Sequence, residues 1–295
     1  MPTPLSEVDI PMPIRLSLAH AVVDHLARQA KVDLLHIKGQ ALDPVLRYED
    51  RRSSDVDILV HPTQVDALMA VLITAGFEVR THFETGSIFR HAANLHHPHW
   101  GWVDVHRSFP GIGIPPASAF QQLWEHRGAS TIAAQELAVP ALLDQALILV
   151  LHAARDSGAG KPDVDHLRQA LSEQQWATVV LRAQELNAEV AFAAATGGLD
   201  EFRNRPEHDL WEVASQGGTR SQEWRARVRA APSVREKARI VGEAFSPNDD
   251  HLRMRLGHEP SASERRRAYL SRPLVALGEL KSLVASRRDR RAAQR

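Results

Sequence analysis

The sequence contains no cysteine, so it can form no disulfide framework, no cysteine-ligated zinc site and no thiolate nucleophile. It also has no long uninterrupted apolar run, because its most apolar stretch, ALLDQALILVL, is broken by Asp144 and Gln145. The first residues, MPTPLSEVDIPMPIRL, have neither the cationic start nor the continuous apolar stretch of a signal peptide. We therefore expect a cytoplasmic protein that spans no membrane.

The sequence also lacks a net charge, because 36 Lys and Arg residues balance 36 Asp and Glu residues. The balance does not hold locally. From His251 to Arg295 there are 12 basic and 4 acidic residues, a difference of +8, which leaves −8 for the first 250 residues. A basic arm of this kind can contact RNA or another polyanion. A solvated and partly frayed terminal helix is an equally good interpretation.

Hydrophobic periodicity divides the chain into a mixed part and a helical part. In the first part we predict helices over 15–30 and between Pro62 and Gly76, and strands over 34–39, 55–60, 77–83, 87–95 and 100–109. After the Gly- and Pro-rich segment 109–116 the composition shifts to helix-forming residues. In the second part we predict helices over 117–127, 140–156, 163–187 and 188–203.

These elements predict an α+β fold. Apolar residues make up 43% of the chain and charged residues 24%, as in ordinary folded proteins. We expect a mixed β-sheet with packed helices over residues 1–115, a mostly helical domain over 116–250, and a basic helical arm over 251–295.

Two aspartates stand at the start of the strand predicted over 55–60. Because side chains alternate along a strand, Asp55 and Asp57 point to one side while Val56 and Ile58 point to the other. Two carboxylates so close together suit Mg²⁺, which prefers carboxylate, water and phosphate oxygens. An Asp-x-Asp pair is also common on surface strands and in turns, so the pair alone is weak evidence.

A third acid strengthens the case for a metal site. Asp104 lies in the alternating strand Trp102-Val103-Asp104-Val105-His106, where an uncompensated carboxylate facing a core would be costly. A metal shared with Asp55 and Asp57 on a neighbouring strand would compensate it, and three carboxylates support a two-metal arrangement. The competing interpretation is an aspartate that faces solvent on an edge strand.

The order of these motifs resembles that of poorly characterised bacterial nucleotidyltransferases in the DNA polymerase β-like superfamily. The resemblance spans about residues 34–107 and rests on Lys38-Gly39, Arg51, Ser54-Asp55-Val56-Asp57-Ile58-Leu59-Val60 and Val103-Asp104-Val105-His106. It implies a polymerase β-like nucleotidyltransferase core and transfer of a nucleoside monophosphate from an NTP to an acceptor hydroxyl. The implied cofactor is Mg²⁺, with Mn²⁺ as an alternative ion.

The resemblance also implies roles for individual residues. Asp55 and Asp57 would bind both metal ions, and Asp104 would bind the catalytic one. The residues expected to contact the nucleotide or its triphosphate are Lys38, Gly39, Arg51, Ser54 and His106. A Gly-Ser pair is usual in the superfamily where this chain has Gly39-Gln40, so Arg52 is expected to help neutralise the phosphates.

Several alternatives stay open. Lys38 could be a strand-end residue with its ammonium in solvent, and His106 could be a satisfied core histidine. His152 and Asp165 fall where the family has a His and an Asp. The acceptor could be RNA or tRNA, as in nucleotidyltransferase toxins, an antibiotic-like small molecule, or a protein hydroxyl. The alternative function is a catalytically silent relative that binds nucleotide or a partner, although the mutual repulsion of three intact acids argues against it.

Overall fold

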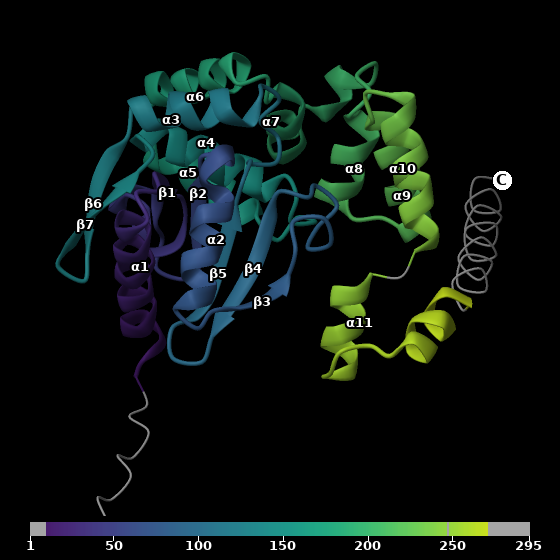
Figure 1. Cartoon of the computed structure of the whole chain (residues 1–295). Helices are drawn as coiled ribbons and strands as arrows, with labels where there is room; N and C mark the ends of the chain where they lie inside the picture. The colour runs from purple at the N-terminus through teal and green to yellow at the C-terminus, as the bar shows by residue number, and fades with distance from the viewer. Residues whose placement is uncertain (1–9, 247, 271–295) are drawn as a thin grey trace, which may run out of the picture. The chain divides into compact units, whose positions relative to one another are not determined.

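The fold is that of a computed structural model, which describes residues 10–246 and 248–270 (Figure 1). Two compact units interleave along the chain: unit 1 comprises Met1–Leu149 and Asp165–Ala188, and unit 2 comprises Val150–Val164 and Glu189–Arg295. The division expected from the sequence, with domain borders after residues 115 and 250, stays a prediction. The part of the basic arm over 271–295 lies outside the described residues.

A five-stranded mixed sheet forms the centre of unit 1, with strand order β1-β2-β5-β4-β3. The strands are β1 Leu34–His36, β2 Asp55–Val60, β3 Glu78–Thr81, β4 Ala92–His97 and β5 Gly101–His106. β2 and β5 run parallel, whereas the other three neighbouring pairs are antiparallel. This arrangement confirms the predicted α+β class with a mixed sheet.

One face of the sheet is covered by α1 (Met12–Gln29) and α2 (Val65–Thr74), as Figure 1 shows. The alternation of β2 points Val56, Ile58 and Val60 into the apolar core beneath these helices. The intervening residues of β2 therefore point to the opposite face of the sheet. Burial of Val56 and Ile58 thus fixes which way the acidic residues of β2 point.

The first predicted strand is shorter than expected. β1 ends at His36, and Gly39 begins the 3₁₀ helix Gly39–Ala41 with a φ of +66°. A Cβ on Gly39 would lie 2.7 Å from Ser53 Oγ, so both the backbone conformation and the space require glycine. A second 3₁₀ helix, Pro44–Leu46, continues the connection toward β2.

The segment after the sheet contains a hairpin that the sequence pattern did not predict. The hairpin pairs β6 (Gly128–Ile132) with β7 (Gln135–Val139) and follows α3 (Pro116–Glu125). Its turn residues, Ala133 and Ala134, have φ of 50° and 60° without the Asn or Gly that usually marks such a turn. This missing signal explains why no strands were predicted between the helices expected over 117–127 and 140–156.

The helix predicted over 163–187 is two helices, α5 (Lys161–Ala170) and α6 (Glu173–Glu185). Ser172 separates them, because its hydroxyl accepts from the Gln175 amide and the Gln175 side chain caps Ser172 in return. The preceding helix is α4 (Leu142–Ala153), and the borders between the two units fall within α4 and α5.

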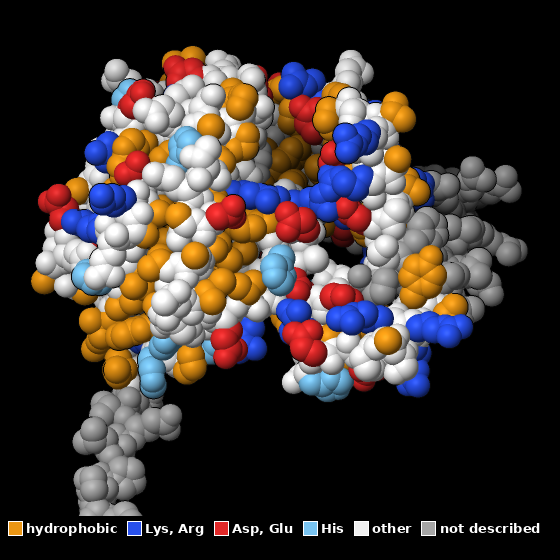
Figure 2. Space-filling view, viewed as in Figure 1, with side chains coloured by type: hydrophobic (Ala, Val, Ile, Leu, Met, Phe, Trp, Pro, Cys, Tyr) orange, Lys and Arg blue, Asp and Glu red, His pale blue; other side chains and the backbone are white. Residues whose placement is uncertain are grey.

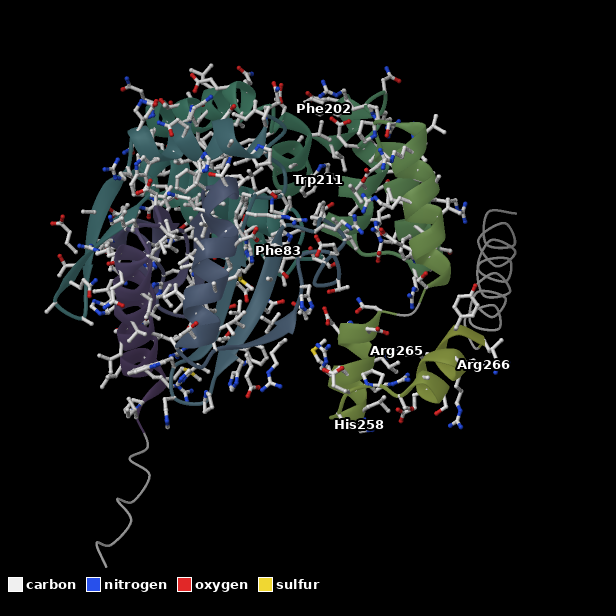
Figure 3. The ribbon with its side chains drawn as sticks, in the orientation of Figure 1. Phe83, Phe202, Trp211, His258, Arg265 and Arg266 are labelled. Carbon is white, nitrogen blue, oxygen red and sulfur yellow. The ribbon has the colours of Figure 1, made fainter. Side chains whose placement is uncertain are left out.

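Unit 2 is helical in the part of the chain that the structure describes. Its elements are α7 Glu189–Thr196, a 3₁₀ turn Leu199–Phe202, α8 His208–Gln216, α9 Arg220–Ala230, α10 Val234–Phe245, α11 Asp249–Leu256 and a helical stretch over 262–270. Trp211 of α8 is buried, and Figure 3 labels it with Phe202 and Phe83. Among the described helices, none is long and apolar enough to cross a bilayer.

Candidate active site

The register between β2 and β5 brings two of the predicted acids together. Asp57 and Asp104 are direct partners in the parallel pair, and Asp55 is the partner of Trp102. Directly paired residues point to the same face, so all three acids lie on the face opposite the α1/α2 core. The interpretation of Asp104 as an aspartate on an edge strand is wrong, because β5 lies between β2 and β4.

A potential metal-ligand set forms where these strands meet. Asp57, Asp104 and His106 each offer a ligand atom, and the three atoms lie within 4.8 Å of one another. Asp55, at the first position of β2, is not in this set. It is close enough for the charge of Asp57, after burial, to raise the pKa of its carboxyl. The structure thus adds His106 to the group and leaves Asp55 beside it.

Asp57 is held by two cationic or polar partners. Its Oδ1 lies 2.8 Å from the Lys38 Nζ and 2.9 Å from the His106 Nε2. Although burial alone would raise it, Lys38 and His106 hold the pKa of Asp57 far below its usual range. Lys38 is only 7% exposed, so the interpretation of its ammonium as solvent-exposed is wrong.

Asp104 has a different environment from Asp57. Burial, and then the nearby charges of Asp57 and Asp55, raise the pKa of the Asp104 carboxyl to about 7. The Asn94 amide on β4 donates a hydrogen bond to Asp104 Oδ1, and Thr81 on β3 donates to Asn94 Oδ1. Neither Asn94 nor Thr81 was identified from the sequence. Asn94 could have been identified as a polar residue that stands between the apolar, buried Ala93 and Leu95 in a predicted strand.

His106 is a buried residue with polar and aromatic neighbours. Its ring centroid lies 5.1 Å from that of His91 and 5.9 Å from that of Phe109. The ring packs against buried aromatic neighbours and also contacts Asp57, so its part in the site stays a prediction. His91 is also buried, and its Nδ1 lies 2.8 Å from the Ser87 hydroxyl.

The remaining predicted nucleotide contacts lie in the connection before β2. Ser53, beside Gly39, donates a hydrogen bond of 3.1 Å to the backbone oxygen of Asp55 and so ties the glycine loop to the first acid. Ser54 is exposed and Arg51 is partly exposed, and their nucleotide contacts stay predictions. His152 belongs to unit 2 and Asp165 to unit 1, so their part in the site also stays a prediction.

An exposed aromatic residue lies on the same face as the acids. Trp102 is 41% exposed, and its ring centroid lies 4.7 Å from that of His96, its partner on β4. Its direct partner on the other side is Asp55. Trp102 was not identified from the sequence, because a tryptophan that points outward from a strand has no distinctive spacing.

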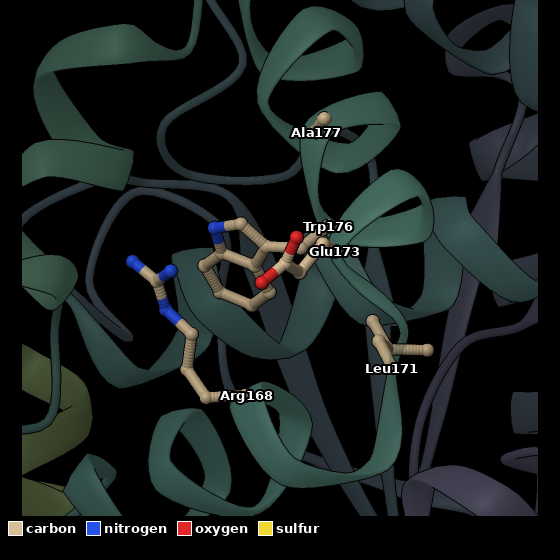
Figure 4. A pocket seen from close by; sticks show the side chains of 5 residues that line it. All are labelled: Arg168, Leu171, Glu173, Trp176 and Ala177. Atoms are coloured by element: carbon tan, nitrogen blue, oxygen red, sulfur yellow. The ribbon is translucent and has the colours of Figure 1, made fainter.

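A separate cavity lies at the turn between α5 and α6. It has a volume of about 190 Å³ and is lined by Arg168, Leu171, Glu173, Trp176 and Ala177 (Figure 4). The Arg168 guanidinium lies over the Trp176 ring, 3.9 Å from its centroid. None of the residues that the sequence assigns to the site lines this cavity.

A mixed sheet that presents acids from two parallel neighbouring strands is the core expected of a nucleotidyltransferase. The chain belongs to the family of uncharacterised nucleotidyltransferases, whose model matches residues 17–204, more than half of its length. Membership of this family makes an NTP the expected substrate. No curated protein matches the sequence significantly.

Three solved structures match parts of the chain at low identity. The lincosamide antibiotic adenylyltransferase LnuA, bound to lincomycin, is 16% identical with a TM-score of 0.37, over 52% of this chain and 96% of that one. The antibiotic-resistance factor ANT(2'')-Ia is 13% identical with a TM-score of 0.41, over 64% and 96%. An antigenic nucleotidyltransferase-like protein from Paracoccidioides brasiliensis is 15% identical with a TM-score of 0.37, over 62% and 92%. Likeness at these identities concerns the fold and not the substrate.

Proposed function

We propose that the protein is a divalent-metal-dependent enzyme that transfers a nucleoside monophosphate from an NTP to an acceptor hydroxyl. The observation that carries this proposal is the pairing of Asp57 with Asp104 across β2 and β5, where both carboxylates are largely withdrawn from solvent. Asp55 adds a third carboxylate at the first position of β2. The proposal applies to the face of the sheet opposite α1 and α2.

The residues fit a divalent cation. Carboxylate oxygens are the ligands that Mg²⁺ prefers, and the His106 nitrogen in the set also suits Mn²⁺. The pKa of Asp104 is raised first by burial and then by the charges of Asp57 and Asp55, which Lys38 alone does not balance. A bound divalent ion would supply the missing positive charge, lower the pKa of the attacking hydroxyl and stabilise the leaving pyrophosphate.

The chain's own residues would prepare and hold these groups. Lys38 and His106 keep Asp57 ionised through Oδ1, and we assign Oδ2 of that carboxylate to the cation. Asp104 is also the candidate acceptor for the proton of the hydroxyl, because a carboxylate beside a metal ion can act as a general base. Arg51 and Arg52 in the preceding connection would neutralise phosphate oxygens.

Trp102 is proposed to stack on the base or on the acceptor. Its exposed ring lies on the same sheet face as the acids and beside Asp55. A stacked base contributes about 1–3 kcal/mol, so Trp102→Ala should raise the KM of one substrate by roughly tenfold while kcat changes less. Separate titrations of NTP and acceptor will show which substrate the ring contacts.

The acceptor is proposed to be a hydroxyl of RNA or of a small molecule. Two described arginines of the basic arm have acidic partners: Arg253 contacts Asp250 and Glu259, and Arg265 contacts Asp249. Figure 2 likewise shows basic and acidic side chains interspersed over this part of unit 2, and Figure 3 labels Arg265 and Arg266 there. These pairs leave less positive charge for RNA than the composition of the arm suggests.

The experiment tests transfer and acceptor together. The protein is incubated with each labelled NTP and Mg²⁺ or Mn²⁺, and with either total RNA or a panel of hydroxylated small molecules including antibiotics. Asp57→Asn and Asp104→Asn should abolish labelling, whereas Asp66→Asn, an exposed change on α2, should leave it unchanged. Labelling that survives both site variants would overturn the proposal, and NTP binding without transfer would favour the silent relative.

A further inference from the structure

The edge of the sheet next to Asp104 contains a register shift of one residue. Along β3 and β4, Val79 pairs with Leu95, and the next pair is Thr81 with Asn94. Arg80 is therefore an extra residue on β3, as in a β-bulge. In a regular antiparallel pair Arg80, not Thr81, would stand opposite Asn94.

The shift decides which side chain faces the acids. Leu95 and Val79 pack in the α1/α2 core, so Asn94 points to the opposite face, where it is the direct partner of Asp104. The residue opposite Asn94 points to that face as well. Thr81 takes this position and is 8% exposed, whereas the Arg80 side chain is 41% exposed and contacts Glu78 at 2.7 Å. The bulge thus replaces an arginine with a threonine beside the carboxylates.

A chain of hydrogen bonds follows from this placement. The Thr81 hydroxyl donates to Asn94 Oδ1 and accepts from the Asn94 backbone amide at 3.3 Å. With its carbonyl oxygen occupied by Thr81, the Asn94 side chain presents its NH₂ group to Asp104 Oδ1. The donor is a neutral amide, so it orients the carboxylate without neutralising it. An arginine at this position would compete with a cation for Asp104.

We propose that Asn94 and Thr81 are positioning residues that hold Asp104 Oδ1 and direct its other carboxylate oxygen toward a divalent cation. This inference rests on the proposed function, because it assigns a metal to Asp104. Partners of metal-binding carboxylates typically contribute 10–100-fold to metal affinity or activity. Thr81 acts through Asn94, and Asn94 acts through Asp104.

The test measures Mn²⁺ affinity in the absence of nucleotide, by calorimetry or electron paramagnetic resonance, in addition to transfer activity. Asn94→Ala should weaken Mn²⁺ binding by roughly 10–100-fold. Thr81→Val, which removes the hydroxyl but keeps the shape, should weaken it by a smaller factor of about 3–10, since it acts one bond further away. Thr81→Ser keeps the hydroxyl and should restore wild-type affinity, which a purely packing role for the methyl group would not do.

The outcomes separate this inference from the proposed function. Thermal unfolding without metal monitors folding, and the near-isosteric Thr81→Val variant serves if Asn94→Ala does not fold. If Asp104→Asn abolishes Mn²⁺ binding while Asn94→Ala and Thr81→Val bind as the wild type does, the positioning role is overturned and the metal site stands. If the wild type binds no Mn²⁺ with or without NTP, both are overturned.

Discussion

Two buried polar clusters lie on opposite faces of the same sheet, and they differ in how their charge is balanced. The rear cluster, under α1, comprises Asp24, His20 and His36. Asp24 Oδ2 contacts Arg28 at 2.6 Å, and the two histidines share an Nδ1 to Nδ1 contact of 2.9 Å. Burial lowers the pKa of both histidines, that of His20 to about 3, so the rings are neutral.

The front cluster comprises Asp55, Asp57 and Asp104 with Lys38 and His106. Here three carboxylates face one lysine, whereas in the rear cluster one carboxylate faces one arginine. The pKa values of Asp104 and Asp55 are both raised, first by burial and second by the charge of Asp57. The second cause reflects the excess of carboxylates over cationic side chains. A charge-balanced cluster stabilises a fold without help, but an unbalanced one indicates a site for a cation.

The largest expected difference between the clusters is in catalysis. Asp57→Asn should reduce transfer by roughly 10³-fold or more, because it removes a charge that the proposed site depends on. Asp24→Asn, the matched change in the rear cluster, should change transfer by less than about twofold while it lowers the free energy of unfolding by about 1–3 kcal/mol. Transfer rates and urea unfolding of both variants measure this contrast. Equal losses of transfer would remove the distinction between the clusters.

The clusters should also give opposite dependences of stability on pH in metal-free buffer. The folded-state pKa of His20 is lowered to about 3, so between pH 6.5 and 3 the unfolded chain binds the extra proton and stability falls as pH falls. The folded-state pKa of Asp104 is raised to about 7, so between pH 7 and 4 the folded chain binds the extra proton and stability rises as pH falls. Each effect is on the order of 4–5 kcal/mol at most.

Single variants separate these opposing effects. Asp104→Asn should make the protein more sensitive to acid than the wild type, since it removes a group that stabilises the fold on protonation and leaves the lowered pKa values of His20 and His36. His20→Gln should have the opposite effect and make the protein less sensitive to acid than the wild type, with His36 as the remaining buried histidine. Urea unfolding between pH 4 and 8 with EDTA measures both slopes. Identical slopes in the two variants would show that these residues do not dominate the pH dependence.

Divalent metal should stabilise the front cluster and not the rear one. At a concentration 100 times the dissociation constant, Mn²⁺ or Mg²⁺ should add about 2.7 kcal/mol to the free energy of unfolding, because it binds only the folded chain. The increase should vanish in Asp104→Asn and persist in Asp24→Asn. Thermal unfolding with and without EDTA measures it. A metal response that Asp104→Asn retains would move the ion away from the proposed site.

The sequence alone predicted which way the side chains of β2 point, but not how β2 pairs with its neighbouring strands. Alternation along 55–60 predicted that Asp55 and Asp57 share a face, because Val56 and Ile58 need burial. The register that pairs Asp57 with Asp104 is a long-range feature set by packing of the whole sheet. The sequence supported only the expectation that Asp104 lies on a neighbouring strand, because an uncompensated carboxylate facing a core would be costly. Lys38 beside Asp57 could be proposed as a site residue, but its buried ion pair needed coordinates.

Features that break local rules were not predictable from the residues. The bulge at Arg80 has no glycine to mark it, and its effect on Thr81 appears only when β4 is paired. The hairpin β6–β7 turns through Ala133 and Ala134, which are residues typical of helices. In both cases pairing with a distant strand overrides the local preference. The sequence of β3 alone indicates a regular strand, and the alanines of the turn alone favour a helix.

The smallest predicted effect concerns this hairpin, which contributes Gln135 to the rear cluster through a 2.6 Å bond to Asp24 Oδ2. Ala134 has a φ of +60°, a conformation that glycine adopts without a Cβ clash. Ala134→Gly should therefore raise the free energy of unfolding by about 0.5–1 kcal/mol, whereas Ala129→Gly in the exposed part of β6 should lower it by a similar amount. Neither change should alter transfer or metal affinity, because neither Ala134 nor Ala129 is among the residues assigned to the site. Urea unfolding of both variants checks the signs, and a destabilised Ala134→Gly would mean that the turn is held in another conformation.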